Sequence, residues 1–230
     1  LTGLNDRNYF DLRAMHFDVQ EDALDSTNGS RAQKQPWVLP SLDYAYIPET
    51  PLAGGQLTFN LNSRAMYRND LDEAFNTAYN SATPVQRVRG IEGDSGRLTG
   101  EAEWKKTIIT DGGLVITPLL AFQADANYVD ASSNSLAAIN SMASNPLINT
   151  TADTRSSFAR FMATAGLELR YPILFSMAHS SHVLEPMVQT FVRPNEQYVG
   201  GLSIPNEDAQ SFVFDATTLF ERDKFSGYDR

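Results

Sequence analysis

Cysteine is absent from the 230-residue sequence, which excludes a disulfide scaffold and a cysteine-based metal site within this segment. No apolar run is long enough for a transmembrane helix, which needs about 20 residues. Basic residues are also few, 18 against 28 acidic ones, and the net charge of −10 argues against a nucleic-acid partner and against electrostatic adsorption to anionic lipid. Membrane-crossing β-strands stay open, because each needs only about 9–11 residues of alternating character.

The two ends of the sequence carry no targeting information. It begins at Leu1 rather than methionine, shows no signal peptide, and stops at Arg230 in what looks like the start of a strand. We therefore expect an internal piece of a longer protein, truncated at both ends, and its lack of a signal says nothing about location. Its length would also suit one or two soluble domains.

Alternation with period two runs through most of the sequence and predicts β-strands. In Gln56–Arg68, Leu57 and Phe59 fall on one face and Asn60 on the other. Residues 158–171 alternate in the same way. Both segments are longer than the usual strand of about 5–6 residues, as a membrane-crossing strand requires. Further strands are predicted at residues 9–19, 37–47, 97–106, 114–128 and 182–194.

Long and short links alternate between these strands. The short links are residues 48–55, 107–113 and 172–181, and they carry turn formers such as Gly54-Gly55. The long links are residues 20–35, 69–96, 130–157 and 195–211. Residues 69–79 have a mixed pattern compatible with a short helix. Bacterial outer-membrane barrels have short periplasmic turns and long extracellular loops, whereas long structureless links are uncommon in compact soluble domains.

Strands and links together predict an all-β fold, an antiparallel up-and-down meander of about 7–8 long strands. The polar strand faces carry rows of mixed charge, which suit the wetted interior of a barrel; a solvated sandwich face is the alternative. The residues predicted to face the lumen are Arg64, Arg68, Glu101, Glu103, Arg160, Glu168, Arg170, Glu185 and Arg193. Aromatic residues near the strand ends fit interfacial girdles, with ordinary sandwich-core aromatics as the alternative.

Three local patterns imitate catalytic or metal sites, and none predicts one. Residues 93–96 (GDSG) match the surroundings of a trypsin-like serine, but the other parts of that site are missing, so a loop end is expected. His179 and His182 lack a third ligand at a meaningful spacing. Residues 206–208 (NED) lack the spacing of a calcium loop. We predict no catalytic residue, cofactor site or metal site.

The C-terminal residues 205–230 (PNEDAQSFVFDATTLFERDKFSGYDR) resemble the "PNEDS…F-FD…NLF…RFSGYDR" block of the LptD family. Residues 38–46 (VLPSLDYAY), 9–13 (YFDLR) and 183–189 (VLEPMVQ) are similar to other strands of that family, in the same order along the chain. The family-motif residues in the terminal block are Asn206, Glu207, Asp208, Asp215, Asp229 and Arg230.

The resemblance implies a partial segment of a large transmembrane β-barrel in the Gram-negative outer membrane, part of the translocon that assembles lipopolysaccharide at the cell surface. Residues 1–230 then belong to the C-terminal barrel domain, without the periplasmic jelly-roll domain, and form barrel wall and extracellular loops. The implied partners are lipopolysaccharide, an LptE-like plug lipoprotein and a periplasmic bridge component. The alternatives are a generic porin-like channel and a soluble all-β binding module.

Overall fold

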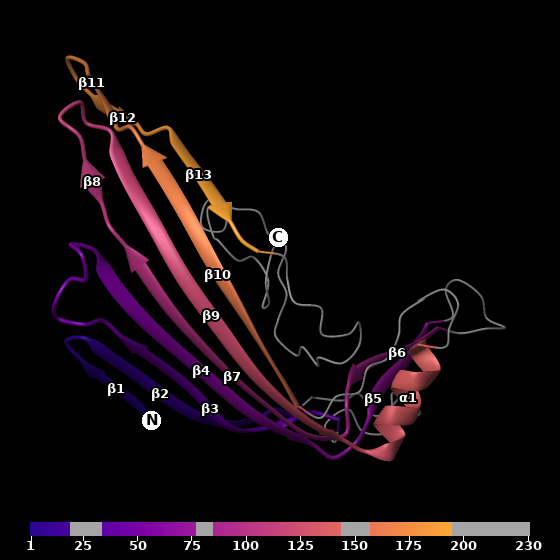
Figure 1. Ribbon diagram of the computed structural model, residues 1–230. Coiled ribbons are helices and arrows are strands. Elements are labelled where there is room, and N and C mark those ends of the chain that lie inside the picture. The colour runs from indigo at the N-terminus through magenta and orange to yellow at the C-terminus, as the bar shows by residue number, and fades with distance from the viewer. Residues whose placement is uncertain (19–33, 77–84, 144–156, 195–230) are drawn as a thin grey trace.

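The structure is a computed structural model and describes residues 1–18, 34–76, 85–143 and 157–194 (Figure 1). Its main feature is one long antiparallel sheet whose strands follow their order in the chain. The strands are β1 (Thr2–Asn5), β2 (Asn8–His16), β3 (Trp37–Tyr46), β4 (Gln56–Arg68), β7 (Gly93–Lys105), β9 (Val115–Ala131), β10 (Ser157–Arg170) and β13 (Met187–Val192), with β8 (Ile108–Ile109) paired to β9. The predicted all-β meander is confirmed, as an open sheet consistent with a barrel segment.

Smaller elements occupy the links at the two ends of the sheet. At the long-link end lie the hairpin of β5 (Asp72–Asn76) and β6 (Val85–Gly90) and the helix α1 (Ser133–Ala143), which packs against β6 (Figure 1). At the short-link end lies the hairpin of β11 (Ile173–Ser176) and β12 (Ser181–Leu184). Across the described ranges, no helix has both the length and the apolar character to span a membrane.

The start of α1 is fastened to the start of β7. The fully buried Ser135 hydroxyl accepts a hydrogen bond from the Glu92 backbone N–H at 2.8 Å and donates to the Glu92 carbonyl at 3.2 Å. Ser132 caps the helix, because its hydroxyl accepts the Ser135 N–H at 3.2 Å. These bonds fix α1 beside the long-link end of the sheet.

Three local expectations from the sequence are wrong. Residues 182–194 form two strands, β12 and β13, because Pro186 has no N–H to donate to a ladder. Residues 93–96 are the first four residues of β7 and pair with both β4 and β9, so they are not a loop end. Residues 69–79 contain the strand β5 rather than a short helix.

The register through the centre of the sheet is unbroken. From β4 through β7 and β9 to β10 the pairing runs without a shift, so that Phe59 pairs with Ala102 and Phe122 with Ala163. On β3 the register shifts between Val38 and Ser41, with Pro40 at the break. This bulge keeps the aromatic residues of β3 on one side, because Trp37 still pairs with Tyr67.

One face of the sheet is apolar and uncovered. Phe59 is 39% exposed, Phe161 53% and Leu167 37%. Among the described elements, every substantial contact of a main-sheet strand is with a neighbouring strand, so no second layer packs on the sheet. A soluble sandwich would bury these side chains against a second sheet. The exposed apolar face therefore contradicts the sandwich alternative.

Candidate functional site: the polar face of the sheet

Strand pairing divides the side chains into two faces, because directly paired residues share a face and neighbours along a strand alternate. The polar face includes Asp11, Asp43, Asn62, Arg64, Arg97, Thr99, Glu101, Glu103, Gln123, Asp125, Asn127, Arg160, Thr164, Glu168, Arg170 and Gln189. The apolar face includes Leu57, Phe59, Leu61, Leu98, Ala102, Trp104, Leu120, Phe122, Phe161, Leu167 and Leu169.

A row of directly paired residues, the acidic row, crosses the polar face from β1 to β10. It contains Thr2, Asp11, Asp43, Asn62, Thr99, Asp125 and Arg160. At its β1 end, the Thr2 hydroxyl donates to Asp11 at 2.9 Å, and Arg13 forms an ion pair with the same carboxylate. In the middle, the Asn62 amide donates to Asp43. Each of these carboxylates therefore has a donor in the sheet itself.

At its β10 end the acidic row contains a buried ion pair. Arg160 Nε donates to Asp125 Oδ2 at 2.9 Å, and the two side chains are only 12% and 2% exposed. A charge-assisted bond in such a site is stronger than a neutral one. Each buried charge has lost its contact with water and is stabilised by the other, so removing one partner leaves the second charge uncompensated. The pair joins β9 to β10 on the polar face.

A second row lies beside the acidic row and carries positive charge. This basic row contains Arg13, Ser41, Arg64, Arg97 and Asn127. Arg64 and Arg97 stand directly opposite each other, an arrangement that is unfavourable for like charges alone. The acidic row lies directly beside the basic row, so this face carries a band of aspartates next to a band of arginines.

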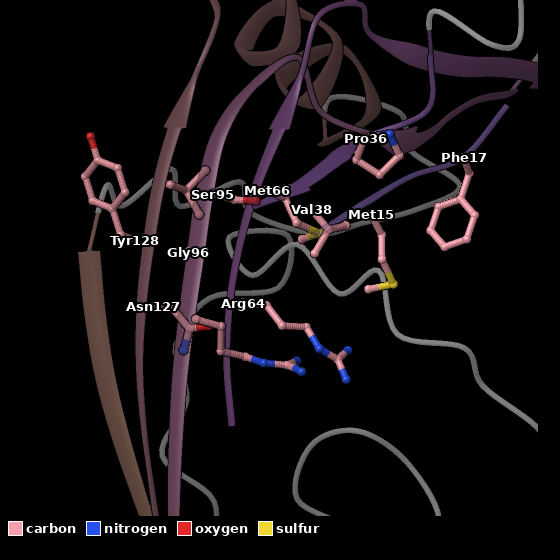
Figure 2. A pocket seen from close by; sticks show the side chains of 12 residues that line it. Met15, Phe17, Pro36, Val38, Arg64, Met66, Ser95, Gly96, Asn127 and Tyr128 are labelled. Atoms are coloured by element: carbon pink, nitrogen blue, oxygen red, sulfur yellow. The ribbon is translucent and has the colours of Figure 1, made fainter. Parts of the chain in front are cut away.

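Next to the basic row, towards the long-link end, the polar face becomes apolar and hollow. Met15, Val38 and Met66 pair across β2, β3 and β4 and line a pocket together with Arg64. Figure 2 shows these side chains on one side of the strands, while Tyr128 points to the opposite side. The pocket thus offers an apolar wall beside guanidinium groups.

The structure brings most of the predicted lumen residues together on this face. Those within its strands are Arg64, Arg68, Glu101, Glu103, Arg160, Glu168 and Arg170. Arg193 follows β13 and donates to the Thr164 hydroxyl at 3.1 Å. Glu185 lies in the break between β12 and β13, where it pairs with Arg170 at 3.3 Å, so its predicted place in a strand is wrong. That these residues face a lumen stays a prediction.

Several polar residues of this face were not predicted. Asp125 lies in an alternating run in which Gln123 and Asn127 share its face, so the same pattern would have identified it. Asp11 and Asp43 sit in strands whose alternation is less regular, and β3 changes parity at its bulge. Only the pairing of strands shows that these aspartates form one row.

The apolar face has the height and the edges of a lipid-contacting band. Trp37, Tyr67 and Tyr128 lie near its long-link end, and Trp104 lies near its short-link end. From Tyr67 to Leu57, β4 rises by roughly 33 Å at about 3.3 Å per residue, or roughly 25 Å along the membrane normal for a tilt of about 40°. This equals the apolar band of about 25 Å in outer-membrane barrels.

A single antiparallel sheet with one exposed apolar band, aromatic edges and a charged opposite face defines the class of outer-membrane β-barrel proteins. The family model described as LptD: LPS transport system D matches residues 1–230, and the chain belongs to the LptD family. Its members are transport proteins, not enzymes, and assemble lipopolysaccharide at the Gram-negative outer membrane. The resemblance noted in the sequence is confirmed, and the porin-like alternative is set aside. No curated protein matches the chain.

Residues 205–230, the block that carried most of the resemblance, lie outside the described residues. All six family-motif residues belong to this block. The family assignment rests on the match of the family model to residues 1–230. Residues 38–46 and 9–13, which resemble two family strands, fall in β3 and β2.

Removing one partner of the buried ion pair is expected to be costly. Arg160→Leu should lower the free energy of unfolding by about 3–5 kcal/mol, because Asp125 then stays buried without its counter-charge. The double variant Arg160→Leu/Asp125→Leu should lose much less. Urea unfolding of the whole protein in vesicles, followed by heat-modifiable gel mobility, measures both.

Lys105→Leu is the matched control, since it breaks a Lys105–Glu103 pair of 2.7 Å in which the lysine is 51% exposed. Such an exposed pair is worth at most about 1 kcal/mol. A double variant as unstable as Arg160→Leu would contradict the assignment of the cost to an unpaired charge.

Proposed function

We propose that residues 1–230 form part of the C-terminal barrel domain of an LptD-type translocon, as barrel wall and surface loops. In this arrangement the apolar face contacts lipid and the polar face lines the lumen. The observation that carries the proposal is the contrast between the faces: Phe59 and Phe161 are exposed, while Asp11 and Asp125 are buried. A soluble protein has the opposite preference.

The energetics favour this orientation. Each Phe or Leu moved from water into an apolar surrounding gains about 1.5–3 kcal/mol, and the apolar face presents many such side chains. On the other face, Asp11, Asp43 and Asp125 accept hydrogen bonds from side chains of neighbouring strands, and the polar groups there can meet water or a polar partner. The sheet is thus stable with lipid on one side and a polar interior on the other.

The links suggest which end lies outside the cell. Short turns are periplasmic and long loops extracellular in bacterial outer-membrane barrels. By this rule, α1 and the β5–β6 hairpin lie at the cell surface, and the β11–β12 hairpin lies on the periplasmic side. Lipopolysaccharide emerges at the surface that α1 then helps to form.

We assign two further partners by the same reasoning. An LptE-like plug lipoprotein contacts the polar face, where the acidic and basic rows offer charged and hydrogen-bonding groups to a folded partner. A periplasmic bridge component delivers lipopolysaccharide through parts of the protein outside this segment. Neither partner contacts the apolar face.

The face assignment predicts that a substitution by arginine is costly at one of two adjacent positions and tolerated at the other. Phe122→Arg places a charge in the lipid-facing band and should cost about 2–4 kcal/mol near the membrane centre. Gln123→Arg places it on the polar face beside Glu101 and should be tolerated. The measurement is the fraction of folded barrel in the outer membrane of cells that depend on the variant.

The two positions are adjacent and receive the same arginine, so the depth and size of the introduced side chain are matched. Equal loss of folded barrel for both variants would contradict the two-face assignment. Phe122→Leu controls for loss of the aromatic ring, which lies 6.1 Å from that of Phe161.

The plug assignment predicts a face-specific crosslink. A photo-crosslinking amino acid at Gln123 should capture the plug lipoprotein in intact cells, whereas the same amino acid at Phe122 should capture none. Capture from Phe122 alone, or from neither position while both variants assemble, would contradict contact between the plug and this part of the polar face.

A further inference from the structure

The β11–β12 hairpin continues the ladder of β10 and β13 past the end of the main sheet (Figure 1). Arg170 pairs with Met187 at the end of that ladder. Three residues further along one strand, and three earlier on the other, Ile173 pairs with Leu184. The register is therefore unbroken, and each side chain of the hairpin can be assigned to the continuation of one face.

Unlike the main sheet, the hairpin is apolar on both faces over its first two rungs, Ile173–Leu184 and Leu174–Val183, and polar residues begin at His182 and Ser181. Ile173 and Phe175 continue the apolar face, as their register requires. Leu174 and Val183 continue the polar face, yet they are apolar and 67% and 65% exposed. Residues 171–184 contain no aspartate, glutamate, lysine or arginine. The charged character of the polar face thus ends before the hairpin begins.

An ion pair lies where the charged residues of the polar face end and the hairpin begins. Arg170 and Glu185 form an ion pair across the last rungs before the hairpin. Beyond this pair, the apolar residues have no described element to pack on, since β11 and β12 make substantial contacts only with each other. An isolated two-stranded hairpin is marginally stable in water, and an exposed apolar patch of this kind marks a contact surface.

Lipid fits this surface. The hairpin adjoins the band formed by Leu167 on β10 and Val188 on β13, both of which are exposed on the apolar face. An absence of charge on either face suits an apolar surrounding. Among the described residues the outer edges of the hairpin have no partner strand, and unpaired N–H and C=O groups are very unfavourable in the hydrocarbon core. The boundary between headgroups and acyl chains meets both requirements.

We infer that the β11–β12 hairpin is a membrane-interface anchor, with its apolar side chains at the headgroup boundary of the leaflet at the short-link end. The tip, which includes His179 and Ser180, lies among the headgroups and water. This inference rests on the proposed function, which places the apolar face in lipid. It adds an attachment of the barrel wall to the membrane outside the spanning strands.

Site-specific quenching tests the anchor in the assembled protein with its plug lipoprotein, in phospholipid vesicles. The segment has no cysteine, so Leu174→Cys, Phe122→Cys and Asp111→Cys each introduce one new site for an environment-sensitive fluorophore. The unsubstituted protein, labelled in parallel, gives the background. The quenchers are lipids with a nitroxide near the acyl carbonyl, lipids with a nitroxide near the chain end, and aqueous iodide.

At Leu174 we expect strong loss of fluorescence with the carbonyl-level nitroxide and weaker loss with the chain-end nitroxide and iodide. At Asp111, in the polar turn between β8 and β9 at the same end, iodide should quench most strongly. Quenching of the Leu174 label by iodide alone would overturn the inference, because the hairpin would lie in water. Protection from all three quenchers would also overturn it, because a protein would cover the hairpin.

The Phe122 label separates this inference from the proposed function. Strong quenching there by the chain-end nitroxide means that the apolar face contacts lipid, whatever the result at Leu174. Absence of lipid quenching at Phe122 would instead contradict the proposed barrel wall itself.

Discussion

The unbroken pairing of β4, β7, β9 and β10 is the constraint on which the rest of this structure depends. A slip of one residue in any of these ladders would move every side chain of the following strand to the other face. The apolar band, the acidic row and the Arg160–Asp125 pair all require the observed register. The bulge at Pro40 also preserves the two faces, because it places Trp37 on the same side of β3 as the other aromatic residues of that strand.

With that register, a single layer carries apolar side chains on one face and polar side chains on the other. The ladders satisfy the backbone groups within the sheet, which lipid requires of any spanning segment. In the proposed orientation, the side chains of the apolar face contact lipid and need no specific partners. On the polar face, Asp43 and Asp125 each accept a bond from a neighbouring strand, which stabilises these charges at membrane depth in the proposed orientation. In the proposed barrel, such a wall would keep an aqueous or protein-filled interior apart from the bilayer.

The sequence alone predicted the long strands well, because apolar and polar side chains alternate along them and each set lies on its own face of the sheet. The bounds of β4 match the prediction, and those of β10 differ by one residue at each end. Elements governed by other contacts were missed. The helix α1 has no charged residue and is fixed by buried bonds to Glu92, a contact between distant residues. The aspartates of the acidic row lie on β2, β3 and β9, and only the pairing of these strands through β4 and β7 aligns them.

The most direct test of the two-face account is a spin-label scan along β4 in the assembled protein, with one cysteine at each position of Gln56–Arg68. Collision with lipid-soluble oxygen and with a water-soluble nickel chelate is measured at every label. The account predicts that oxygen collision alternates with period two, with maxima at Phe59 and Leu61 and minima at Asn60 and Asn62. Oxygen collision that is uniform along the strand, or highest at Asn60 and Asn62, would contradict it.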